Sequence, residues 1–137
     1  MKQFWILAAL LAAATPLGAQ SEGEQLFMNN CVACHGVTGH GDGPQAANLR
    51  TRPADLTRIA ARRDGVWPIL EVMSILDGYM KVTNPREDMP VFEDFLDDDM
   101  VEFDTGNGLT TMVPVKLIEV ATYLETIQNP KPTRYVP

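Results

Sequence analysis

Two cysteines and a histidine lie within five residues of one another, at Cys31-Val32-Ala33-Cys34-His35. The spacing of three between the cysteines places their sulfur atoms where they can form thioether bonds to the two vinyl groups at one porphyrin edge. The adjacent imidazole can then bind the iron from below as an axial ligand. The motif therefore predicts one covalently attached haem c, with Cys31 and Cys34 holding the ring and His35 ligating the iron.

Other uses of these side chains fit the sequence less well. A structural disulfide would leave His35 without a role, and a thioredoxin-like redox motif needs a βαβ pattern that the sequence lacks. A zinc site needs four ligands, and only His40 stands near enough to complete the set. A zinc-binding interaction module is therefore an alternative, but an unusual one for such a short, glycine-rich stretch.

The face of the iron opposite His35 needs a second ligand or stays open. His40 follows the attachment motif too closely to cross the ring, so a methionine thioether is the usual remaining choice. Met89 precedes Pro90 in a predicted loop far along the chain, and Met112, just before the last predicted helix, is the first alternative. Met80 is the third candidate.

The N-terminal residues have the pattern of a secretory signal peptide. Lys2 is followed by an apolar run over residues 4–14 and by the small-residue site Leu17-Gly18-Ala19, which predicts cleavage before Gln20. A spanning helix needs about 20 apolar residues, and Thr15-Pro16 interrupts this run too early. We therefore expect a signal peptide at 1–19, a single domain at 20–137, no membrane anchor after cleavage, and a location in the bacterial periplasm.

The rest of the chain predicts short helices joined by loops. Apolar periodicity and capping residues indicate helices over about 22–30, 55–63, 67–78 and 114–128, with a short helical turn within 92–100. Four glycines and a proline make residues 36–44 a loop. Strand alternation is not evident, so the expected class is all-α, although residues 105–108 form a turn signal that suggests the tip of a hairpin-like insertion.

Charge is unevenly distributed along the sequence. The formal net charge is −7, which argues against nucleic acid as a partner. Nine acidic residues and no Lys or Arg fall between Glu87 and Asp104, whereas five arginines fall between Arg50 and Arg63. Such clusters are usually solvated surface, but segregated charge can also steer a redox partner.

Several segments together resemble the class I cytochrome c family, of the monohaem bacterial type. They are Gly23-Glu24-Gln25-Leu26-Phe27, the attachment motif, Gly39-His40-Gly41-Asp42-Gly43-Pro44, Pro53-Ala54-Asp55-Leu56, Met89-Pro90 and the helix from Val115 to Gln128. The resemblance implies four to five helices wrapped around one haem. It also implies that Met89 is the second axial ligand and that the Pro44 carbonyl accepts the His35 ring proton.

The same resemblance implies a close crossing of the first and last helices, and in a protein this small the haem should form much of the apolar core. Gly23 and Phe27 should meet Val120, Ala121 and Leu124, and eight residues are candidate pocket walls: Leu49, Leu56, Ile59, Trp67, Ile69, Val72, Leu76 and Leu124.

The expected function is electron transfer between redox proteins and not catalysis. The chain would act as a monomeric carrier or as the haem subunit of a periplasmic dehydrogenase or oxidase. The alternative is a haem enzyme or gas-binding protein with an open sixth position.

Overall fold

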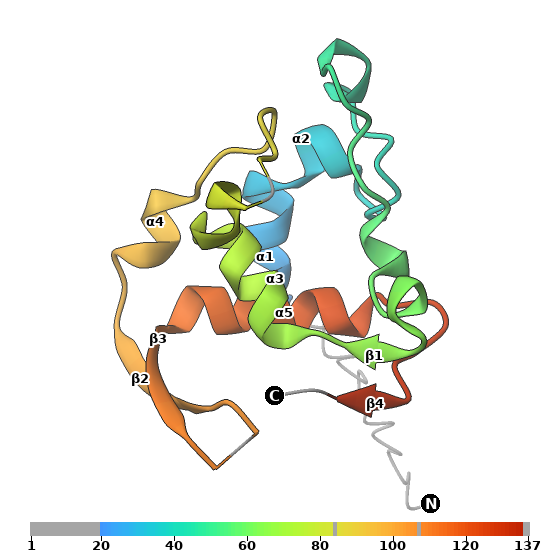
Figure 1. The fold of residues 1–137 in the computed structure, drawn as a ribbon. Coiled ribbons are helices and arrows are strands. Elements are labelled where there is room, and N and C mark those ends of the chain that lie inside the picture. Colours follow the sequence, from blue (N-terminus) through green and yellow to red (C-terminus); the bar gives the residue numbers. More distant parts are fainter. Residues whose placement is uncertain (1–19, 84, 107, 136–137) are drawn as a thin grey trace, which may run out of the picture.

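The computed structural model describes residues 20–83, 85–106 and 108–135, and most of their regular structure is helical (Figure 1). Its α-helices are α1 Glu22–Asn30, α2 Val32–His35, α3 Ile69–Leu76, α4 Glu93–Leu96 and α5 Val115–Thr126. Short 3₁₀ segments are η1 Ala46–Asn48, η2 Leu56–Arg58, η3 Ala61–Arg63 and η4 Tyr79–Val82. The strands are β1 Val66–Trp67, β2 Met100–Asp104, β3 Thr110–Pro114 and β4 Arg134–Tyr135. The predicted signal peptide, residues 1–19, lies outside the described residues.

Helices α1 and α5 cross at close range, as the resemblance implied. The Ser21 side chain accepts a hydrogen bond from the Glu24 amide and caps α1. A Cβ atom at Gly23 would lie 2.0 Å from the carbonyl oxygen of Glu119 in α5. The Phe27 ring is fully buried, and its centroid lies 5.2 Å from that of Tyr123. Glycine therefore allows the two backbones to approach while Phe27 fills the space beside them.

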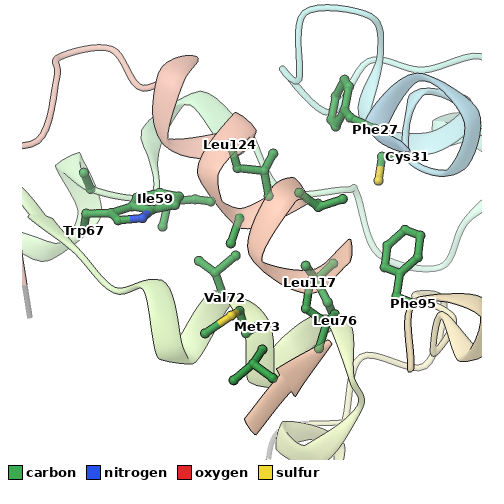
Figure 2. Packing of buried hydrophobic residues seen from close by; sticks show 14 residues of the cluster. Phe27, Cys31, Ile59, Trp67, Val72, Met73, Leu76, Phe95, Leu117 and Leu124 are labelled. Carbon is green, nitrogen blue, oxygen red and sulfur yellow. The ribbon is translucent and has the colours of Figure 1, made fainter. Parts of the chain in front are cut away.

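The buried core lies around α5. Figure 2 shows Leu117 and Leu124 of α5 between Phe27 and Cys31 on one side and Ile59 and Trp67 on the other. Helix α3 adds its apolar face to this core, with Val72, Met73 and Leu76 all buried. None of the helices in the described part of the chain is long and apolar enough to cross a membrane.

The segment predicted as a helix over 55–63 forms two 3₁₀ turns instead. An α-helix would pair the Ala60 amide with the Leu56 carbonyl four residues earlier. Here the Gln128 side chain takes both groups, because its Oε1 accepts from the Ala60 amide at 3.0 Å and its Nε2 donates to the Leu56 oxygen at 2.7 Å. A contact from the far end of the chain thus divides the helix into η2 and η3.

The prediction of an all-α fold was wrong, although the hairpin-like insertion is confirmed. Strands β2 and β3 form an antiparallel hairpin with Val101 opposite Val113 and Phe103 opposite Thr111. Strands β1 and β4 form a second, parallel pair. The hairpin projects from the helices (Figure 1), and alternate residues such as Val113 and Phe103 pack toward the core. Its strands carry β-branched and aromatic residues on either side of a glycine turn, which favours a hairpin.

Replacing Gly23 by alanine should destabilise the protein. The new methyl group cannot fit beside the Glu119 carbonyl, so α1 and α5 must separate. We expect a loss of about 1–3 kcal/mol in the free energy of unfolding, despite the better helix propensity of alanine. Denaturant unfolding of the haem-loaded protein measures this loss. Asn29→Ala, at an exposed position of the same helix, should change stability by less than about 0.5 kcal/mol; equal effects would contradict the crossing described here.

Candidate functional site

The cysteine motif lies on α2, and the glycine-rich loop folds back over it. Cys31 ends α1, and its carbonyl accepts a hydrogen bond from the His35 amide at 2.8 Å. The loop returns through bonds from the Gly43 amide to the Cys34 carbonyl and from the Gln45 amide to the Ala33 carbonyl. The motif therefore stands on a turn of helix that is supported from behind, which limits how far its side chains can move.

The imidazole of His35 is held by a backbone carbonyl, but not by the one expected. Its Nδ1 lies 2.9 Å from the carbonyl oxygen of Ala54, so the prediction for Pro44 was wrong. The reason is the course of the loop, because the bonds of Gly43 and Gln45 keep Pro44 over α2. Residues 53–54 approach instead: a Cβ atom at Gly41 would lie 2.3 Å from the Pro53 oxygen.

This hydrogen bond leaves one ring nitrogen of His35 free for a ligand. With the proton on Nδ1 and donated to Ala54, Nε2 carries the lone pair that a metal requires. Burial lowers the pKa of His35, opposed by its bond to the Ala54 carbonyl. Because burial is the larger effect, the imidazole favours its neutral form, and the hydrogen bond to Ala54 sets the orientation of the ring.

A cavity of about 600 Å³ brings together all four predicted site residues: Cys31, Cys34, His35 and Met89. Six of the eight candidate walls also line it: Leu49, Leu56, Ile59, Val72, Leu76 and Leu124. Trp67 and Ile69 are not among the lining residues. Trp67 packs in the core near Ile59 (Figure 2).

Met89 reaches the cavity just before the chain returns to the end of α3. The Gly78 position lies against the Val91 side chain, so that a Cβ atom there would be 2.6 Å from Val91 Cγ2. The Phe92 amide bonds the Leu76 carbonyl at 3.5 Å, and the Phe92 ring stacks on buried Phe95 with centroids 5.0 Å apart. These contacts hold the chain directly after Met89, which lines the cavity.

The other two methionine candidates lie elsewhere. Met112 is on β3 with 52% of its surface exposed, paired with Glu102 across the hairpin. Met80 lies in η4 and, like Met112, does not line the cavity. The hairpin therefore carries Met112 away from His35, while Met89 stays beside it.

The chemistry of the donor set fits a covalently attached haem. Both cysteines are free thiols, and Cys31 is only 6% exposed. Burial, with a smaller contribution from Cys34, raises the pKa of Cys31 to about 12, so a thiolate is costly there. An uncharged thioether avoids that cost, and the largely apolar walls suit a porphyrin ring. Among the described residues, no three or more His, Cys, Asp or Glu side chains are grouped to hold a metal ion.

Five arginines contribute to the lining of the cavity. Arg50, Arg52, Arg62, Arg63 and Arg86 all line it, against only two acidic residues, Glu87 and Asp88. We call these five arginines the arginine rim. Arg50 pairs with Glu87 at 2.8 Å and Arg63 with Glu71. Arg52 is exposed and makes no ion pair or hydrogen bond with the described residues.

Sequence reasoning missed several residues of the site. Ile75 and Phe92 line the cavity, and Ala54 supplies the carbonyl for His35. Ile75 lies next to the periodic apolar positions of α3, so a prediction with a broader apolar face on this helix would have included it. The Ala54 carbonyl has no signal in the residue type, because every residue carries one.

Comparison with known proteins identifies the family of the chain. No curated protein and no solved structure gives a match. The match to the protein family described as Cytochrome c covers residues 20–102, which is more than half of the chain and runs from before α1 into β2. Members of that family bind haem c, with its iron, covalently, and one haem is typical of the domain. The chain therefore belongs to the cytochrome c family.

Proposed function

We propose that this protein passes single electrons between redox proteins of the periplasm, which specifies further the haem-based electron-transfer role of its family. In this proposal Cys31 and Cys34 attach the haem, and His35 and Met89 are the two axial ligands. The observation that carries it is the convergence of these four side chains on one cavity. They come from two segments of chain separated by α3.

The surroundings of the two ligands support electron transfer over chemistry on a bound substrate. Haem c, when bound, supplies an iron atom that can be ferric or ferrous. The Ala54 carbonyl orients His35 and makes its imidazole a stronger donor. A Met89 thioether favours the ferrous state, and so do apolar walls, since the ferric site carries one more positive charge. Ligands on well-supported segments need little movement when the charge changes.

The periplasmic location rests on the signal-peptide pattern at residues 1–19. Attachment of haem through Cys31 and Cys34 would then take place outside the cytoplasm. The protein would act there as a free carrier or as the haem subunit of a dehydrogenase or oxidase. In both cases its partner is another redox protein.

The arginine rim is the face that we propose for docking. Electrons should enter and leave where the cavity opens, and the cavity lining includes five arginines and two acidic residues although the whole chain has a net charge of −7. A local field of this kind attracts an acidic surface more strongly than the net charge suggests. The acidic residues between Glu93 and Asp104 lie on α4, β2 and the link between them, and none of them lines the cavity.

Replacing both cysteines tests the attachment. In Cys31→Ala/Cys34→Ala, we expect haem to be removed by acidified organic solvent, whereas in the native protein it should stay with the chain. His40→Ala is the control, because His40 does not line the cavity, and it should keep its haem. Haem staining of denaturing gels measures both. Haem retained by the double variant would show that the attachment lies elsewhere.

Replacing Met89 tests the second ligand. Met89→Ala should lose the weak long-wavelength ferric absorption band that a sulfur-to-iron bond produces, and its ferrous form should bind carbon monoxide. Met112→Ala should keep the band, because Met112 is exposed on the hairpin. Loss of the band in Met112→Ala alone would transfer the role to Met112. A native protein that lacks the band and binds carbon monoxide would favour the haem enzyme or gas-binding alternative.

The rate of oxidation by a small anion tests the arginine rim. The ferrous protein should react with ferricyanide more slowly as salt is added, because the rim attracts the anion and salt screens that attraction. Arg52→Glu should lower the rate at low salt several-fold, because it replaces a positive charge that attracts the anion by a negative one that repels it. Lys131→Glu makes the same charge change away from the cavity and should have a smaller effect. A rate that rises with salt would mean that the net negative charge dominates and that the rim does not guide the approach.

A further inference from the structure

The side chain of Gln128 is buried just beyond the end of α5, where it forms three hydrogen bonds to the backbone. Only 3% of its surface is exposed. Its Oε1 accepts from the Ala60 amide at 3.0 Å, and its Nε2 donates to the carbonyls of Leu56 and Leu124, both at 2.7 Å. A buried amide with its hydrogen bonds satisfied holds the groups that it joins at defined positions.

The backbone beside Gln128 strengthens the same connection. The Asn129 amide donates to the Thr57 carbonyl at 2.8 Å, and the Arg58 guanidinium donates to the Asn129 carbonyl at 3.0 Å. The segment 56–60 is thereby bound to the end of α5 by several hydrogen bonds. Of the groups that make these bonds, Gln128 is the one whose side chain reaches the middle of that segment, between η2 and η3.

The segment bound by Gln128 leads directly to His35. Leu56 and Ile59 line the cavity, and the Leu56 amide bonds the Gly39 carbonyl of the attachment loop at 2.7 Å. Two residues before Leu56, the Ala54 carbonyl lies 2.9 Å from His35 Nδ1. The position of that carbonyl therefore depends on how residues 56–60 are held.

We propose that Gln128 is a positioning residue for His35, acting through the turn that carries the Ala54 carbonyl. It keeps Leu56 and Ala60 from pairing with each other and so holds residues 54–60 in the shape that accepts the His35 proton. This inference rests on the proposed ligation of iron by His35. Gln128 touches neither His35 nor the cavity.

Removing the side-chain amide of Gln128 should weaken the His35–Ala54 hydrogen bond, because it changes how the backbone around Leu56 is held. Without it, the Ala60 amide and the Leu56 carbonyl either stay buried and unpaired, which is costly, or pair with each other and close a helical turn. Closing the helical turn moves the chain that precedes Leu56, and the cost of leaving both groups unpaired favours that movement. A weaker bond to Ala54 makes the His35 imidazole a poorer donor, which destabilises the ferric state and raises the reduction potential.

Gln128→Met tests this in the haem-loaded, full-length protein, because methionine has a similar length and no amide. We expect the His35 Nδ1 proton, followed by NMR in the ferrous state, to exchange with water at least about tenfold faster, and the potential to rise. Gly23→Ala is the control for lost stability, because it acts at the α1–α5 crossing and not at this turn. An unchanged exchange rate and potential in Gln128→Met, or the same changes in Gly23→Ala, would overturn the proposal.

A measurement on the native protein covers the case in which Gln128→Met does not fold. Native-state hydrogen exchange should give the same opening free energy for the Ala60 amide and for the His35 Nδ1 proton, because one opening event exposes both. The coupling would be overturned if the two opening free energies differ, so that the Ala60 amide exchanges while the His35 Nδ1 proton stays protected. Failure of the proposed function is seen separately, since native protein would then show no iron-bound His35 signal.

Discussion

The hydrogen bond between His35 and the Ala54 carbonyl depends on several parts of the chain that lie far apart in the sequence. Its 2.9 Å length requires α2, the glycine loop, the turn at residues 53–60 and the end of α5 to meet at one place. The close approach of Gly41 to the Pro53 oxygen brings the carbonyl to the loop. Gln128 holds the following turn from the other side. A ring oriented in this way can present Nε2 to iron without further rearrangement.

The same arrangement separates the apolar and charged parts of the site. The walls from α3, α5 and η2 are largely apolar, whereas three members of the arginine rim, Arg50, Arg52 and Arg62, are exposed to solvent. In the proposed function, the walls would favour ferrous iron and the rim would guide partners toward the opening. The Arg50–Glu87 and Arg63–Glu71 pairs occupy two of the five arginines. Arg52 is left exposed for contact with another molecule.

Local signals in the sequence predicted those parts of the fold that local interactions decide. The Ser21 cap and the periodic apolar residues of α1, α3 and α5 lie within their own helices, and the structure agrees with them. The turn signal at residues 105–108 also indicated the hairpin, but its strands are short and pack toward the core through only a few residues, such as Val113. That pattern is too brief to stand out as alternation.

The remaining differences arise from contacts between distant residues. The helix expected over residues 55–63 is divided by Gln128, which lies far along the chain. The sequence near Asp55 has no pattern that predicts this contact. The choice between the Pro44 and Ala54 carbonyls depends on the course of a loop, not on residue type. The roles of Cys31, Cys34, His35 and Met89 remain predictions, now with the structural support that all four line one cavity.

The coordination of iron in the native protein tests the central claim most directly. Purified protein can be reduced and exposed to carbon monoxide while its absorption spectrum is recorded. Two protein ligands, His35 and Met89, predict a low-spin spectrum that carbon monoxide leaves unchanged. A high-spin spectrum that shifts when carbon monoxide is added would contradict the account, because it would show an open position where Met89 should bind.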